Sequence, residues 1–214
     1  MTEAVARQET GRKASKEFRR QQLIDATIKV LAQKGYATLT VADVARAAGL
    51  STGIIIFHFI SKDELLASVL RFLAEEYYQH WKRVLAAAGE APEARLFALM
   101  QADFNADIYT TDKLSAWIAF WGETQGRPVY EQICGGFDAE RRQACFACCQ
   151  AMISASGYDL DPRITMQALD ALGDGLWLGV TAAGNGLASV SDARRIMQSA
   201  LAAYFPRHYS LEPR

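Results

Sequence analysis

Aromatic side chains and carboxylates recur at helical spacing in the second half of the sequence. Two segments carry them on one helical face: Trp117, Phe120, Trp121 and Thr124 at positions i, i+3, i+4 and i+7 in the first, and Asp170, Asp174, Trp177 and Thr181 at steps of four, three and four in the second. Such intervals place side chains on one face of a helix. Aromatic faces attract a cation by about 0.5–2 kcal/mol each, and a carboxylate supplies net charge. The pattern therefore fits a pocket for a quaternary ammonium ion, with Trp117, Trp121 and Trp177 as its cage and Asp174 as its counter-charge.

A helical core explains the same residues without any ligand. The tryptophans would then fill space, and the aspartates would cap a helix or form hydrogen bonds across a dimer, because a buried carboxylate is costly unless it is paired. Both interpretations stay open from the pattern alone. Five further side chains are candidates to line such a pocket: Tyr77, Trp81, Phe104, Asn105 and Tyr109.

A cysteine cluster offers a different chemistry. Cys145, Cys148 and Cys149 lie within about one helical turn, and Arg141 and Arg142 lie one turn before them. A neighbouring arginine lowers a thiol pKa, and sulfurs at this spacing can share a soft metal ion. Cysteine is also a common small core residue. A thiol-responsive or metal-responsive regulator is therefore the alternative to a cation sensor.

Motifs typical of enzymes are missing from the sequence. It has no glycine-rich phosphate loop, no G-x-S-x-G and no His-Glu-x-x-His, and its three histidines lack the spacing of zinc ligands. We therefore expect a protein that is not an enzyme and that has neither a cofactor nor a metal site.

The periodicity of apolar residues predicts the elements that must position these side chains. A helix is expected from about Ser15 to Gly35, a short one from Thr40 to Gly49, another from Ser51, and a long one from the capping box at Ser61 to about Ala88. Later helices are expected near 93–109, 113–124, 128–155, 162–183 and 191–205. No segment alternates with period two, so the expected fold class is all-α.

Composition and charge divide the chain into three expected regions. Residues 1–14 are polar and fit a flexible arm, residues 15–60 a helix-turn-helix DNA-binding domain, and residues 61–214 an effector-binding and dimerisation domain. Residues 1–64 hold ten Lys and Arg against seven Asp and Glu, whereas residues 65–214 hold thirteen against seventeen. A basic first domain suits a polyanion partner, although a solvated surface has the same composition. No apolar run is long enough to span a membrane, so we expect a cytoplasmic protein with reduced cysteines.

The stretch from Thr40 to Phe59 has the features of a helix-turn-helix. Gly49 supplies a left-handed turn, Leu50 fills the angle between the helices, and Ser51 is expected to cap the second helix. Ser51, Thr52 and Gly53 would then face the major groove. An ordinary helical hairpin is the alternative.

This stretch, continued through Ser61-Lys62-Asp63-Glu64-Leu65-Leu66, resembles the signature of the tetracycline-repressor (TetR) family, and Arg19 to Thr27 resembles that family's first helix. The resemblance implies a homodimer on a palindromic double-stranded operator. It also implies that Thr40, His58 and Lys62 anchor backbone phosphates and that Ser51, Thr52 and Gly53 begin the recognition helix. Many family members have Tyr where Ile56 stands, so that phosphate anchor is not expected here, and Phe57 is expected to pack inside.

Residues 115–121 and 174–178 resemble segments of the choline-responsive repressors of glycine-betaine synthesis genes within that family. The resemblance implies a small, choline-like cationic effector and a role in choline and glycine-betaine metabolism. It also implies a dimer interface on the last two helices, 162–183 and 191–205. We further expect the long helix from Ser61 to couple the effector to the DNA-reading helix as a lever, with Tyr77 and Trp81 near the pocket.

Overall fold

The computed structural model describes residues 2–105, 108, 110–123, 128–181 and 189–210, with side chains from residue 15. Every regular element in these ranges is an α-helix. The helices are α1 (Thr2–Thr38), α2 (Val41–Ala48), α3 (Thr52–His58), α4 (Lys62–Ala87), α5 (Pro92–Ala102), α6 (Thr111–Gly122), α7 (Pro128–Ser156), α8 (Pro162–Thr181) and α9 (Val190–Tyr204). The all-α expectation is confirmed.

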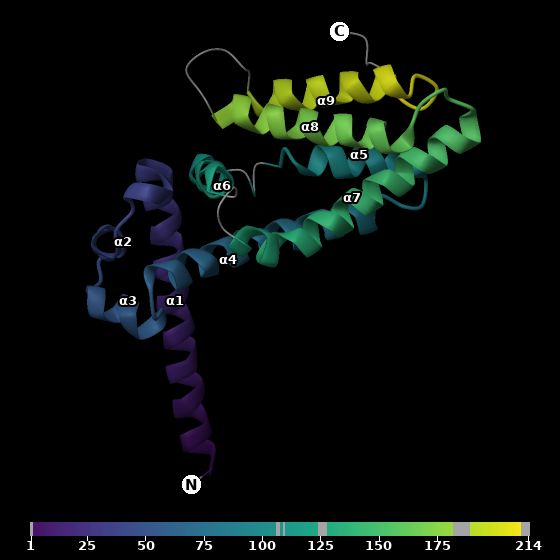
Figure 1. Ribbon diagram of the computed structural model, residues 1–214. Helices are drawn as coiled ribbons and strands as arrows, with labels where there is room; N and C mark the ends of the chain where they lie inside the picture. The colour runs from purple at the N-terminus through teal and green to yellow at the C-terminus, as the bar shows by residue number, and fades with distance from the viewer. Residues whose placement is uncertain (1, 106–107, 109, 124–127, 182–188, 211–214) are drawn as a thin grey trace.

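Two bodies of helices are joined by α4 (Figure 1). The first, α1 to α3, forms a small head, whose core takes its apolar side chains from all three helices and includes Leu23, Val44 and Ile55. In the second, α5 packs against α7, and α8 packs against both α7 and α9. Helix α6 lies between the two bodies, because it contacts both α1 and α8.

The first helix is longer than its sequence predicts. The backbone of residues 2–14, which we assigned to an arm, is helical and continuous with the rest of α1. Ala, Glu, Gln, Arg and Lys are good helix formers, and adding turns to an existing helix avoids the cost of nucleation. This part of α1 projects away from the rest of the chain (Figure 1). Its flexibility and the domain limits stay predictions.

Helix α1 is interrupted at Gly35, where the sequence places its end. Gly35 has φ 75° and ψ 176°, a conformation that an L side chain adopts at a cost. A short helical segment continues beyond it to Thr38. The break redirects the chain toward α2.

Helix α5 ends at Ala102, earlier than the expected limit near residue 109. Asp103 is its C-cap, and the buried carboxylate of Asp103 is held by side chains of two other helices. A tertiary contact therefore ends this helix where local spacing predicts that it continues.

Taken singly, no helix in the described ranges is long and apolar enough to span a membrane. Helices α2 and α3 pass that test only as a pair, and they are bent by 105° relative to each other.

Candidate DNA-reading surface and effector cavity

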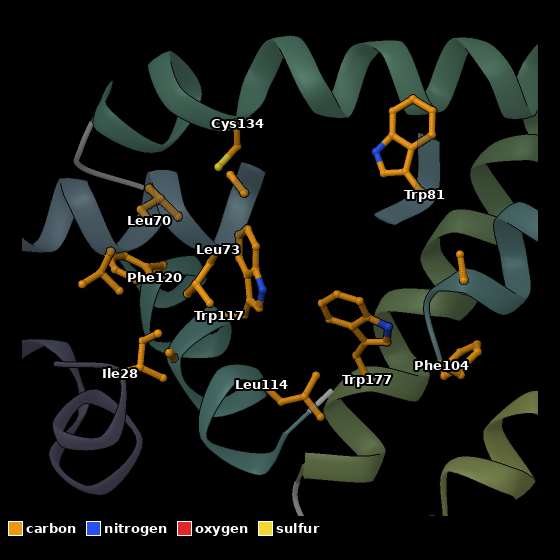
Figure 2. Close-up of a cluster of buried hydrophobic side chains, with 14 of the residues drawn as sticks. Ile28, Leu70, Leu73, Trp81, Phe104, Leu114, Trp117, Phe120, Cys134 and Trp177 are labelled. Atoms are coloured by element: carbon orange, nitrogen blue, oxygen red, sulfur yellow. The ribbon is translucent and has the colours of Figure 1, made fainter. Parts of the chain in front are cut away.

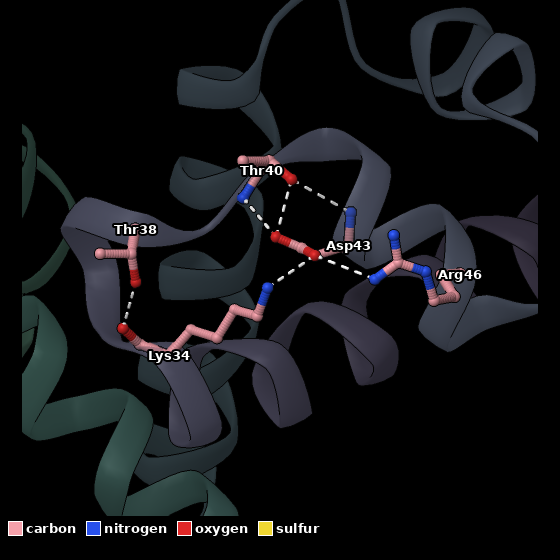
Figure 3. A network of polar contacts seen from close by, with 5 residues as sticks. All are labelled: Lys34, Thr38, Thr40, Asp43 and Arg46. Atoms are coloured by element: carbon pink, nitrogen blue, oxygen red, sulfur yellow. Dashed lines mark hydrogen bonds and ion pairs between the residues drawn. The ribbon is translucent and has the colours of Figure 1, made fainter.

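Helix α2 begins with a network that Figure 3 shows in full. Thr40 is the N-cap: its hydroxyl accepts a hydrogen bond from the Asp43 amide at 3.2 Å, and the Asp43 carboxylate accepts one from the Thr40 amide at 3.3 Å. Lys34 lies 2.7 Å and Arg46 3.3 Å from Asp43. The Lys34 and Thr40 hydrogen bonds lower the pKa of Asp43 to about 2. The Thr40 hydroxyl is thus part of a cap, and its side chain remains exposed.

The turn between α2 and α3 has the expected geometry at Gly49. Gly49 has φ 65°, and its amide donates to carbonyl groups in the last turn of α2. The expected cap at Ser51 is wrong: Ser51 occupies the N-cap position, but its hydroxyl makes no capping hydrogen bond. The Ile54 amide donates instead to the Ser51 carbonyl at 3.1 Å, which satisfies the group that the hydroxyl would have bound.

The exposed face of α3 starts with Ser51, Thr52 and Gly53, as expected for a groove-facing end. One prediction fails here: Phe57 does not pack inside but is 72% exposed. Phe59 is buried in its place, four residues after the buried Ile55. Phe59 is the C-cap of α3 and has an extended backbone, with φ −140° and ψ 122°, whereas Phe57 still lies within the helix, on its outer face.

Two expected phosphate anchors follow the recognition helix. His58 and Lys62 are both half-buried. The pKa of His58 is lowered, mainly by desolvation and then by the positive charges of Lys16 and Arg20. His58 would therefore meet a phosphate as a neutral imidazole. Lys62 is the first residue of α4, whose N-cap Ser61 accepts from the Glu64 amide at 3.1 Å. The Glu64 carboxylate accepts from Ile60 rather than Ser61, so the capping box is displaced by one residue.

A cavity of about 200 Å³ lies where α4, α5, α6, α7 and α8 meet. Its aromatic walls are the indoles of Trp117, Trp121 and Trp177 and the phenol rings of Tyr77 and Tyr130. Its charged walls are the carboxylates of Asp103, Asp138, Asp170 and Asp174 and the guanidinium groups of Arg141 and Arg142. All four candidate effector residues therefore border one space. Pockets for drug-sized ligands measure roughly 300–1,000 Å³, so this one suits a small metabolite.

The indoles reach the cavity from two helices. Trp117 and Trp121 lie on α6 and Trp177 on α8, and Figure 2 shows Trp117 and Trp177 in the interior between these helices. The rings of Trp121 and Trp177 are stacked, with centroids 5.6 Å apart and planes 16° apart. Trp177 also meets the edge of Tyr77 at 6.0 Å. A ligand contacts the outer faces of the stacked pair unless it separates the two rings.

A buried ion network forms the inner wall, and sequence reasoning missed it. Arg141 donates to Asp103 at 2.5 Å and to Asp170 at 2.7 Å, and Tyr77 donates to Asp103 at 2.7 Å. Arg141 and Asp103 are both nearly inaccessible to solvent. An isolated charge is too costly to bury, so Arg141 and Asp103 depend on each other and on Asp170 and Tyr77, which come from other helices. Asp103 gave no signal in the sequence, because its partners lie 26 and 38 residues away.

Asp174 differs from the other carboxylates of the cavity. It is exposed at the mouth, whereas Asp170 is half-buried and bound to Arg141. Partial loss of water around the carboxyl group, followed by the negative charges of Asp170 and Asp103, raises the pKa of Asp174 to about 6. With four carboxylates against two guanidinium groups, the cavity has an excess of negative charge. Such a lining favours a cation.

The comparisons with known proteins agree with both halves of this arrangement. Residues 23–69 match the TetR family of bacterial regulatory proteins, and residues 92–206 match the C-terminal domain of BetI-type transcriptional repressors. The HTH-type transcriptional regulator BetI of Paraburkholderia phymatum is 34% identical over 175 residues, which cover 76% of this chain and 81% of that protein. BetI of Burkholderia thailandensis is 33% identical over 181 residues, covering 79% and 85%. The chain belongs to the BetI-type repressors of the TetR family.

Solved structures share the fold of this BetI-type repressor. A transcriptional regulator from Pseudomonas aeruginosa superimposes with a TM-score of 0.74 at 24% identity, covering 91% of this chain and 95% of that one. A regulator from Saccharomonospora viridis, solved in complex with choline, gives a TM-score of 0.73 at 23% identity, covering 85% and 94%. These relatives are transcriptional regulators and not enzymes, so the repressor acts by binding.

The cysteine cluster of this BetI-type repressor is buried. Cys145, Cys148 and Cys149 all lie in the core, as does Cys134. Burial raises the pKa of Cys145 and of Cys149 to about 12, so both are protonated thiols at neutral pH and poor nucleophiles. Within the part of the chain that the structure describes, no three His, Cys, Asp or Glu residues could hold a metal ion. The cluster is best explained as packing.

Three of the further candidates for the effector site of this BetI-type repressor do not line the cavity. Trp81 is fully buried and packs on Tyr78, with ring centroids 5.3 Å apart, and Figure 2 shows it away from Trp117 and Trp177. Phe104 borders a separate small space beside Trp177, and Asn105 does not line the cavity. Tyr109 lies outside the described residues. Of the four candidates that the structure describes, Tyr77 alone lines the cavity.

Proposed function

We propose that this repressor binds a palindromic operator as a homodimer and that a small quaternary ammonium compound such as choline controls the binding. The observation that carries the proposal is the cavity, in which three indoles and two phenol rings surround a space with four carboxylates and two guanidinium groups. Aromatic rings and excess negative charge are the two features that a methylated ammonium ion requires. The choline bound to the regulator from Saccharomonospora viridis supports the same ligand class.

The proposed biological role is control of choline and glycine-betaine metabolism. The match of residues 92–206 to BetI-type C-terminal domains supports it. In this role Trp117, Trp121 and Trp177 bind the methyl groups of the cation, and Asp174 at the mouth supplies counter-charge. In the head, Thr40, His58 and Lys62 contact phosphates and Ser51, Thr52 and Gly53 face the groove.

A comparison of two ligands of equal shape tests the effector. Choline and 3,3-dimethylbutanol have the same outline, but only choline is charged. Calorimetry on the wild-type protein is expected to show choline binding at least tenfold more tightly, because attraction to the rings and carboxylates depends on the charge. Asp174→Asn is expected to weaken choline more than the alcohol. The variant Asp159→Asn, which changes an exposed aspartate outside the cavity, serves as its control.

Equal affinity for the two ligands would mean that the cavity selects shape rather than charge, and the cationic effector would be wrong. Absence of binding by both would remove choline-like effectors while leaving the repressor assignment in place.

A further inference from the structure

The recognition helix α3 lacks the side chains that usually read base edges. Its sequence from Thr52 to His58 is Thr-Gly-Ile-Ile-Ile-Phe-His, with no Arg, Lys, Asn, Gln, Asp or Glu. Paired hydrogen bonds to guanine come from Arg or Lys and those to adenine from Asn or Gln, and the amino group of cytosine donates to Asp or Glu. Apart from the hydroxyl groups of Ser51 and Thr52, the helix offers apolar groups to the major groove.

Two of these apolar side chains stand on the outer face of the helix. Ile56 is 64% exposed and Phe57 is 72% exposed, although Ile55, between them and the turn, is fully buried. Ile56 follows Thr52 by four positions, and Phe57 follows Gly53 by four, so both continue the face that begins at the groove-facing end. The exposed apolar pair therefore extends the base-reading side of α3.

Positive charge borders this apolar pair. The Lys16 ammonium group lies 5.6 Å from the centre of the Phe57 ring, and Lys62 follows Phe57 by five positions in the sequence. Phosphates flank the major groove on both sides, so cations beside an apolar centre match its charge distribution. A hydrophobic protein partner would not require these cations.

We propose that Ile56 and Phe57 select thymine by contact with its C5-methyl group. Thymine is the base that presents an apolar group in the major groove, and apolar side chains are its known partners. The operator would thus carry thymines at positions in each half-site that lie under α3. This inference rests on the proposed operator binding and adds the class of base contact that gives it specificity.

Uracil provides the test, because it keeps every hydrogen-bonding group of thymine and lacks the methyl group. A selection from random duplexes with the full-length protein first gives the preferred sequence. Duplexes of that sequence are then made with deoxyuridine in place of thymidine, one position at a time. Loss of a contacted methyl group is expected to weaken binding about fourfold. At least one position in each half-site should respond.

Two variants assign the sensitive positions to side chains. Ile56→Ser should lose the thymine-over-uracil preference at one position, and Phe57→Ser at another, because the variant has no apolar group to contact the methyl. Both residues are exposed, so the substitutions leave the core of the head intact. Phe18→Ser is the matched control: Phe18 is an exposed phenylalanine, 66% accessible, on α1 of the same domain. It should keep the full preference.

The results separate this inference from the proposed operator. A preferred sequence that tolerates uracil at every thymine would overturn the methyl contact and leave operator binding in place. If both serine variants keep the thymine-over-uracil preference of the wild-type protein, the methyl contact is overturned too. If these variants keep that preference but change their oligomeric state, Ile56 and Phe57 form a protein contact instead. A selection that yields no preferred sequence would contradict both the operator and the inference.

Discussion

At the scale of single residues, the carboxylates of the cavity have distinct roles. Asp103 and Asp170 are bound to Arg141, and they form the wall. Asp174 has no such ion pair among the described contacts, and it lies at the mouth with a pKa raised to about 6. A carboxyl group with this pKa changes its charge mostly between about pH 5 and pH 7. Binding of a cation should therefore depend on pH through Asp174.

The first prediction concerns this dependence. A bound cation favours the ionised form of Asp174, and below pH 6 binding must first release its proton. Affinity for choline should therefore rise from pH 5 to pH 7 and be constant above, with binding at pH 5 roughly tenfold weaker than at pH 8. Calorimetry at four pH values measures this. Asp174→Asn should flatten the profile, and Asp159→Asn should keep it; a wild-type profile flat from pH 5 to 8 would contradict the role of Asp174 as counter-charge.

At the scale of helices, two elements connect the cavity to the head. Helix α4, which we expect to act as a lever, carries Tyr77 to the cavity and begins at Lys62, shortly after the recognition helix ends at His58. Helix α6 is a second route, which local sequence did not indicate. It presents Trp117 and Trp121 to the cavity, and its Phe120 meets the edge of Tyr36 on α1 at 5.8 Å. Trp81, which we also expect to couple the two sites, is buried in the core rather than at the cavity, and its coupling role stays a prediction.

The second route leads to a prediction about coupling. An effector shifts DNA binding only through contacts that differ between two arrangements of the head. Phe120→Leu keeps an apolar side chain in the core but removes the ring contact with Tyr36. We expect choline and operator each to bind as before, while their mutual effect of about 1–3 kcal/mol becomes smaller. Choline affinity measured with and without saturating operator gives this effect.

The matched control is Phe97→Leu, because Phe97 has a comparable ring contact with Tyr209, with centroids 6.3 Å apart, outside the contact between α1 and α6. It should keep full coupling. Undiminished coupling in Phe120→Leu would assign the transmission to α4, and no coupling in the wild-type protein would contradict regulation by the ligand.

At the scale of the whole molecule, α8 shows an uncovered apolar face. Ile164, Ala168, Ala171, Gly175 and Leu178 follow one another at intervals of four and three, the spacing of a helix seam. Ile164 is 62% exposed and Leu178 47% exposed, so this face is not buried within the chain. Small residues at its centre allow a second helix to approach closely. The face fits the proposed homodimer.

Gly175→Lys tests the dimer. A Cβ atom added at Gly175 meets no atom of a neighbouring helix within 4 Å, and lysine favours a helix more than glycine does, so the protomer should fold at least as well. In a dimer the lysine would introduce bulk and charge at the seam. We expect sedimentation to show a monomer with greatly weakened operator binding. Gly136→Lys, at an exposed and equally open glycine of α7, should remain dimeric, and a dimeric Gly175→Lys protein would exclude this face.

Local patterns in the sequence were sufficient for the elements and for much of the candidate site. The spacing of apolar residues predicted the helices, the turn at Gly49 and the shared face of Trp117 and Trp121, because hydrogen bonds within a helix and its period depend on neighbours in the chain. The family signature in residues 40–66 depends on the same local order.

Only the tertiary structure decided which side chains meet across the chain. Arg141 binds Asp103, 38 residues away, and this ion network both ends α5 and builds the cavity wall. In the head, packing against the other helices likewise buries Phe59 and leaves Phe57 exposed, although the two phenylalanines lie only two positions apart. A charged or aromatic side chain is stabilised by any suitable partner, so its own position in the sequence does not specify which partner it meets. That choice depends on how whole helices pack against one another.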